Sequence, residues 1–103
     1  MIHVLAIITA LPGQRESVLE IFRANMPNVL AEQGCIEYGP AVDVPDGGAS
    51  QVPLGPDTFC VVEKWADMDA LRAHAAAPHM AAYAAKVKPM LASRTIHILA
   101  PAA

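Results

Sequence analysis

The stretch Phe59 to Tyr83, FCVVEKWADMDALRAHAAAPHMAAY, decides the fold, because its pattern of apolar residues changes from that of a strand to that of a helix. Its first part, up to Trp65, is rich in β-branched and aromatic residues, which is typical of a strand. Asp67 then offers a carboxylate that can cap a helix. The next inward positions follow helical spacing and are Met68, Leu71, His74 and Ala75. The stretch therefore predicts a strand, a turn and a helix, and it carries a carboxylate, an indole and two imidazoles.

The flanking segments show the same two periods. Ile2 to Leu11 predicts a first strand with two largely apolar faces. Gln14 to Gln33 predicts an amphipathic helix, in which Pro27 should cause a kink or a restart. Cys35 to Val44 predicts a second strand, and Arg94 to Ala100 predicts the last one.

Prolines mark the remaining boundaries. Pro40 cannot donate to a strand ladder, so the second strand should lie at a sheet edge or carry a bulge. Alternation places Ile36 and Tyr38 on one face of that strand. The segment Pro45 to Asp57 is rich in proline and glycine and predicts a long hairpin loop. Pro78 should restart the second helix.

The order strand, helix, strand, strand, helix, strand predicts an α+β fold of the ferredoxin-like βαββαβ type, with an antiparallel sheet and both helices on one face. We expect residues 1–103 to form a single domain. The other sheet face would then expose Leu5 and Ile7. An apolar sheet face in water usually marks an association surface.

Composition excludes several classes of partner. The net charge of −3 provides no basic footprint, so we expect no nucleic-acid partner. Ile2 to Leu11 is too short to span a membrane, and no Lys or Arg precedes it as in a signal peptide, so we expect no membrane association. Cys35 and Cys60 lack any paired spacing and predict reduced, core-facing thiols, which fit a cytoplasmic location.

Several motifs occur together in the order of a known family. They are Pro12-Gly13, then E-x-G-C-x-x-Y-x-P from Glu32 to Pro40, E-x-W at Glu63 and Trp65, H-A-A-A-P-H-M from His74 to Met80, and Tyr83. In these motifs the chain resembles the antibiotic biosynthesis monooxygenase family, and most closely its small quinol monooxygenases, which oxidise menadiol-type substrates. The resemblance implies a homodimer built as a dimeric α/β barrel, with a pocket in each protomer between its sheet and its helices.

The sequence gives no support for a bound cofactor. It has no phosphate-binding loop and no nucleotide fingerprint, so neither flavin nor nicotinamide is expected. Glu63, His74 and His79 are ligand types suited to iron, but the histidines are five apart across a proline rather than three or four apart on one helical face. Haem-degrading relatives use an asparagine, a tryptophan and a histidine, and this chain places Ala6, His74, and Ala84 or Tyr83 at those positions. We therefore expect neither a cofactor nor a metal.

The resemblance implies cofactor-independent oxidation of a quinol or similar dihydroxyaromatic by dioxygen, and this set of residues is compatible with it. Such a reaction needs a base, an aromatic slot and exclusion of water. His74 is the candidate base, His79 is the alternative base or a second polar contact, and Glu63 is a candidate to orient a histidine. Candidate substrate-binding walls are Trp65, Tyr38, Tyr83, Met80 and Phe22.

Each candidate also has a structural interpretation. Trp65, Met80 and Phe22 are residue types that usually serve core packing, and His79 directly after proline can simply close a turn. His74 on an apolar stripe is also compatible with a hydrogen-bonded core histidine. The alternative function is a non-catalytic dimeric module of the same fold that binds a small aromatic ligand. The sequence leaves the substrate open.

Overall fold

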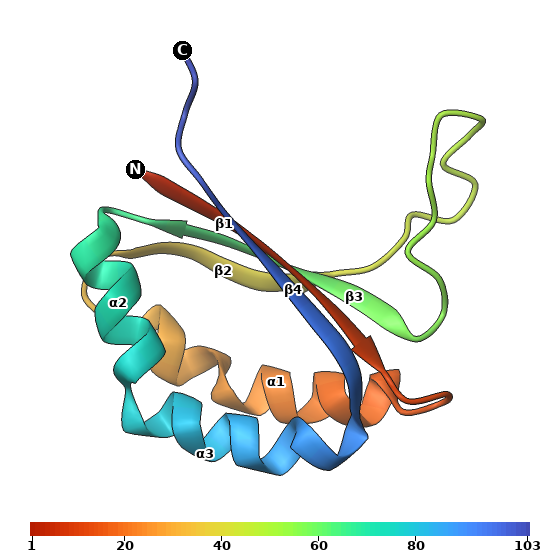
Figure 1. Ribbon diagram of the computed structural model, residues 1–103, viewed down its shortest axis with the longest axis horizontal. Coiled ribbons are helices and arrows are strands. Elements are labelled where there is room, and N and C mark those ends of the chain that lie inside the picture. The colour runs from red at the N-terminus through yellow and green to blue at the C-terminus, as the bar shows by residue number, and fades with distance from the viewer.

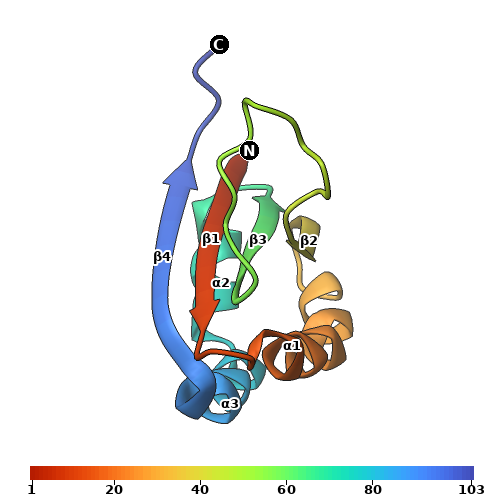
Figure 2. The ribbon, with the colours of Figure 1, turned by 90° about the vertical axis from the view of Figure 1, so that its right-hand side faces the viewer.

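The computed structural model describes residues 1–103 as one four-stranded antiparallel sheet with all the helices on one face (Figure 1). In chain order the elements are β1 (Ile2–Ala10), α1 (Arg15–Leu30), β2 (Cys35–Ala41), β3 (Thr58–Trp65), α2 (Met68–Ala76), α3 (Pro78–Val87), the 3-10 helix η1 (Lys88–Met90) and β4 (Leu91–Leu99). The strand order is β2-β3-β1-β4, as Figure 2 shows. The predicted ferredoxin-like α+β fold is confirmed, and β2 is an edge strand as Pro40 indicated.

The helix boundaries follow local chemistry. The carboxylate of Asp67 accepts a hydrogen bond from the Ala70 amide at 2.8 Å and so caps α2 as predicted. Ala77 is extended, as expected before a proline, and Pro78 opens α3. In contrast, α1 continues through Pro27 to Leu30 without a restart. The proline removes only one amide donor close to the end of this helix, so the remaining hydrogen bonds keep it continuous.

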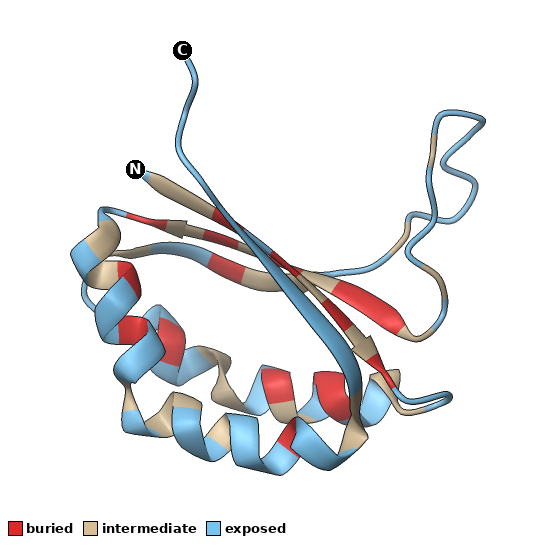
Figure 3. Cartoon of the chain, viewed as in Figure 1, coloured by how far each residue is buried: buried red, intermediate tan, exposed pale blue.

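Burial alternates along β1 and defines the core between sheet and helices (Figure 3). Val4, Ala6 and Ile8 are buried beneath the helices, whereas Leu5 on the other face is 36% exposed. This alternation confirms the predicted facing of the strand. The helix-free face of the sheet, which includes Leu5, Ile7 and Val62, is covered by no element of the chain.

A bulge in β2 changes the predicted facing of that strand. The pairing register with β3 shifts between Cys35 and Glu37. As a result Ile36 is 53% exposed while Tyr38 is 7% exposed, so the prediction that they share a face is wrong. The extra residue resets the alternation, and Cys35 packs against the core on the same side as Tyr38.

The second cysteine also departs from the prediction. Cys60 pairs with Ile7 in the β1–β3 register and lies on the helix-free face, so it is not core-facing. Both thiols are free.

The long loop predicted at Pro45 to Asp57 is confirmed but begins earlier, at residue 42, because β2 ends at Ala41 and not at Val44. Figure 1 shows this loop extending away from the helices. Its base is fixed by the Asp43 carboxylate, which accepts hydrogen bonds from the amides of Leu54 at 2.9 Å and Gly55 at 3.0 Å. The loop therefore lies beyond the end of the sheet and not over the space between sheet and helices. No helix of the chain is both long enough and apolar enough to cross a lipid bilayer.

Candidate active site

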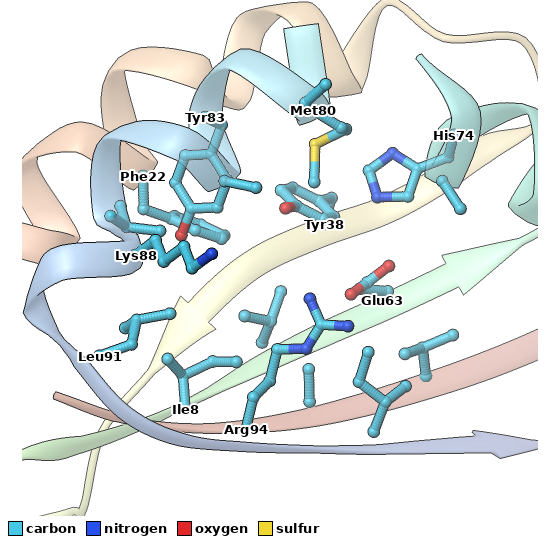
Figure 4. Close-up of a pocket in the computed structure, with 18 of the residues that line it drawn as sticks. Ile8, Phe22, Tyr38, Glu63, His74, Met80, Tyr83, Lys88, Leu91 and Arg94 are labelled. Atoms are coloured by element: carbon cyan, nitrogen blue, oxygen red, sulfur yellow. The ribbon is translucent and has the colours of Figure 1, made fainter. Parts of the chain in front are cut away.

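A cavity of about 780 Å³ lies between the inner face of the sheet and the helices (Figure 4). Hydrophobic residues make up 17 of its 22 lining residues, so a bound molecule would be held mainly by apolar contact. It is open beside β4, whose residues beyond Leu91 are exposed. Six predicted site residues line it: Phe22, Tyr38, Glu63, His74, Met80 and Tyr83. No residue of the 42–57 loop does.

His74 extends from α2 toward the sheet and is only 7% exposed. Its imidazole lies over the Trp65 indole, with ring centroids 4.6 Å apart, and meets the edge of Tyr38 at 5.5 Å. Its Nδ1 lies 2.9 Å from Oε2 of Glu32, a residue just beyond the end of α1. Figure 4 shows the opposite edge of the ring turned into the cavity. Packing and hydrogen bonding thus fix the orientation of this histidine.

Glu32 bridges two histidines with its two carboxylate oxygens. Its Oε1 lies 2.6 Å from Nε2 of His79, and its Oε2 lies at Nδ1 of His74. On the far side, the Asn25 amide nitrogen is 3.2 Å from Nδ1 of His79. The amide orientation of Asn25 is set because its oxygen accepts a hydrogen bond from Asn28 at 3.0 Å.

These contacts define one direction of hydrogen bonding. Because Asn25 donates to Nδ1 of His79, a neutral His79 carries its proton on Nε2 and donates it to Glu32. Glu32, as a carboxylate, only accepts, so the neutral His74 ring donates from Nδ1. Nε2 of His74 is then left with a free lone pair on the cavity side. This arrangement is suited to a general base.

Two predicted site residues do not line the cavity. His79 belongs to the Asn25–His79–Glu32 hydrogen-bond chain and lines a separate hollow of about 470 Å³ on the outer side, between α1 and α3. Trp65 is fully buried beneath His74 and has no face in the cavity. Both were predicted from their residue types and from the motifs of the resemblance, and neither shows which side of a ring is covered.

Glu63 has a different partner from the one predicted. Its Oε1 accepts a hydrogen bond from the indole Nε1 of Trp65 at 3.0 Å, and Glu32 rather than Glu63 orients His74. Burial raises the pKa of Glu63, while the Trp65 hydrogen bond and the nearby His74 act in the opposite direction. The cavity wall therefore carries a carboxyl group whose ionised form is disfavoured by burial.

The raised pKa of Glu63 should be visible in the pH dependence of the free energy of unfolding. A group whose pKa is raised by folding stabilises the protein below its ordinary value of 4.5 and loses that contribution as pH rises through the raised value. Glu63→Gln keeps an oxygen acceptor for Trp65 and cannot ionise. The free energy of unfolding of the variant, minus that of the wild type, should therefore increase between about pH 4 and about pH 7. Urea denaturation across this range measures it, and a difference independent of pH would contradict the assignment.

The aromatic wall is a connected set. Phe22 stacks on Tyr38 with ring centroids 5.2 Å apart and meets the edge of Tyr83 at 6.0 Å. Burial raises the pKa of Tyr38 well above its ordinary value of 10, and burial raises that of Tyr83 to about 12. Both hydroxyls stay protonated at neutral pH, so they can donate hydrogen bonds to a bound oxygen atom but cannot serve as bases.

A family model described as antibiotic biosynthesis monooxygenase matches residues 1–86. The chain belongs to the antibiotic biosynthesis monooxygenase family. A curated member, probable quinol monooxygenase YgiN of Escherichia coli K12, is 40% identical over 103 residues, which cover 98% of each chain.

Solved structures of similar proteins agree with this family fold. PA3566 from Pseudomonas aeruginosa superposes with a TM-score of 0.80 at 27% identity, covering 99% of this chain and 94% of the other. A putative antibiotic biosynthesis monooxygenase from Nitrosomonas europaea has a TM-score of 0.81 at 17% identity over 100% of both chains, which supports the fold alone.

In this antibiotic biosynthesis monooxygenase family member, sequence reasoning missed three polar residues near the cavity. Glu32 stood in a recognised motif without a role. The predicted helix extended to Gln33, whereas α1 ends at Leu30, so the sequence did not show where the Glu32 side chain points. Lys88 and Arg94 line the cavity from η1 and β4. Arg94 alternates with Ile96 and Ile98, which also line it, and that alternation was the available signal. Glu63, His74 and His79 do not form a group able to hold a metal ion.

Proposed function

We propose that this protein is a quinol monooxygenase that oxidises a dihydroxyaromatic with dioxygen and uses no bound cofactor. The observation that supports this most is the His74 imidazole, held by Glu32 through Nδ1 while its Nε2 faces a largely apolar cavity. The similar protein of Escherichia coli carries the name probable quinol monooxygenase. A base beside an aromatic-lined slot is what this chemistry requires of a protein.

The substrate itself can supply the electrons. His74 removes one phenolic proton, and the resulting quinolate gives one electron to dioxygen, forming a semiquinone and superoxide. These recombine at a ring carbon as a peroxide anion, which takes back the proton from His74 to become a hydroperoxide. The hydroperoxide loses water and leaves a hydroxyquinone. One quinol and one dioxygen thus give one hydroxyquinone and one water. Both atoms of dioxygen are accounted for, and the electrons come from the ring.

The other residues divide the remaining tasks. Phe22 and Met80 present apolar walls, and the hydroxyls of Tyr38 and Tyr83 can donate to the substrate oxygens. An apolar enclosure also keeps water from the reacting oxygen species. Glu32 stabilises the imidazolium that forms when His74 takes the proton.

Oxygen uptake tests the proposal. Purified protein should consume dioxygen with at least one quinol from a panel of benzoquinols and naphthoquinols, faster than buffer autoxidation and in proportion to protein concentration. A protein that binds these molecules without accelerating oxygen uptake would instead be the non-catalytic binding module.

We also propose that the protein is a homodimer joined through the helix-free face of the sheet. The apolar side chains Leu5, Ile7 and Val62 lie on this face and no element covers them. An antiparallel face of this kind can pack on a second copy by two-fold symmetry. The free cysteines Cys35 and Cys60 fit a reducing compartment, so we place the dimer in the cytoplasm.

Light scattering should give twice the chain mass of 10.9 kDa at micromolar concentration. Leu5→Asp places an unpaired charge in the proposed interface, so the dimer should dissociate or the variant should aggregate. Glu20→Gln, which changes an exposed side chain of α1, is the control and should remain dimeric. A wild-type protein that stays monomeric would rule the dimer out.

A further inference from the structure

Two cationic side chains that the proposed reaction does not use lie in the cavity. Arg94 at the start of β4 and Lys88 in η1 both line it, and Figure 4 shows the guanidinium and the ammonium turned inward. The β1–β4 register explains the direction of Arg94. It pairs with Ile8, whose side chain is buried on the helix side of the sheet, so Arg94 points to that side as well.

Neither cation has a carboxylate partner in the chain. The lysine and arginine side chains that do form ion pairs, Arg23, Lys64 and Arg72, all lie outside the cavity. The one acidic side chain in the cavity, Glu63, is hydrogen-bonded to Trp65 and forms no ion pair with Arg94 or Lys88. Burial raises the pKa of Tyr83, and the positive charge of Arg94 acts in the opposite direction, so the guanidinium lies near this tyrosine of the cavity wall.

Unpaired cations in a largely apolar cavity indicate an anionic ligand. Both side chains are exposed where they line the open side of the cavity, and a ligand that fills the cavity would cover them. Covering an ammonium or a guanidinium is costly unless it gains a partner of opposite charge. A guanidinium matches a carboxylate with two parallel hydrogen bonds, and an ammonium adds a third. His74 extends from α2, whereas Arg94 and Lys88 come from β4 and η1.

From this arrangement we propose that the substrate is a dihydroxyaromatic carboxylate, bound by Arg94 and Lys88 through its carboxylate while a ring hydroxyl lies at His74. The inference rests on the proposed function and names the substrate class of the same site. It also predicts that the neutral ring alone is the poorer substrate.

Two matched quinols test it. Naphthohydroquinone is neutral, and dihydroxynaphthoic acid is the same ring with a carboxylate. Wild-type kcat/KM should be higher for the carboxylate. Arg94→Gln should lower it about 10- to 100-fold for the carboxylate and less than about twofold for the neutral quinol, since a hydrogen bond between charged groups is lost only with the former. Arg72→Gln, which removes an exposed arginine of α2 outside the cavity, should change neither.

Binding without turnover separates this inference from the function it rests on. Hydroxynaphthoate and naphthol have one hydroxyl each and are not quinols, and calorimetry gives their Kd values. Arg94-dependent binding of hydroxynaphthoate with no quinol oxidation would support the carboxylate site and refute the oxidation. If Arg94→Gln lowers kcat/KM equally for the carboxylate and for the neutral quinol, the carboxylate site is wrong and Arg94 instead stabilises an oxyanion of the ring. Loss of the dimer in Arg94→Gln would also overturn it.

Discussion

His74→Ala should lower kcat for quinol oxidation by about a hundredfold or more, the usual contribution of a positioned base. The imidazole presents Nε2 to the cavity, whereas the hydroxyls of Tyr38 and Tyr83 stay protonated at neutral pH. Steady-state oxygen uptake measures the loss.

His79→Ala is the informative comparison for this result. His79 lies outside the cavity and reaches the reaction only through Glu32, so its removal should cost less than that of His74. An equal or larger loss in His79→Ala would move the base to His79. Unchanged rates in both folded variants would mean that neither histidine removes the proton.

Glu32→Gln should also lower kcat, by about a hundredfold or more. The amide has one oxygen and one NH₂ group where the carboxylate has two oxygens. His79 must still donate from Nε2, because Asn25 donates to its Nδ1, so the new oxygen faces His79 and the NH₂ group faces His74. His74 would then accept at Nδ1 and carry its proton on Nε2, the nitrogen that must act as base. A wrong histidine tautomer of this kind costs about ten-thousandfold in a serine protease triad.

Nitrogen NMR of the His74 ring provides the structural readout. The wild type should show the proton on Nδ1, and Glu32→Gln should show it on Nε2. Glu16→Gln, an exposed glutamate of α1, should change neither the tautomer nor the rate.

Adding Asn25→Asp to Glu32→Gln should reverse the direction of the hydrogen bonds from residue 25 through His79 and residue 32 to His74. The new carboxylate accepts from Nδ1 of His79, so Nε2 accepts from Gln and the Gln oxygen again accepts from His74. Part of the activity should return. If Glu32→Gln keeps both full activity and the Nδ1 proton, the orienting role of Glu32 is wrong.

The regular parts of the fold could be predicted from the sequence because each depends on a local period. Alternation along β1 placed Val4 and Ala6 beneath the helices, and helical spacing placed His74 on the inner face of α2. Pro40 indicated a sheet edge or a bulge in the second strand, but the position of the bulge at Ile36 could not be predicted, since an extra residue in a strand depends on its pairing with β3.

The candidate site was predictable only in part for a related reason. Periodicity indicates a direction, and that was enough for His74 and Met80. For Tyr38 it was not, because alternation placed this residue on the same face as Ile36, which is exposed. Periodicity does not indicate what lies between a side chain and the cavity, so Trp65 was assigned to the wall when it lies beneath His74. Glu32 meets its histidines across more than forty residues of sequence, and only the tertiary structure shows that contact.

The most direct test of the account is the fate of the oxygen atoms when purified wild-type protein oxidises a quinol under isotopically labelled dioxygen. The account predicts one dioxygen consumed for each hydroxyquinone formed, one labelled oxygen in that product, the other in water, and no such product above the buffer rate with His74→Ala. Formation of unlabelled quinone and hydrogen peroxide at the rate of buffer autoxidation would contradict it.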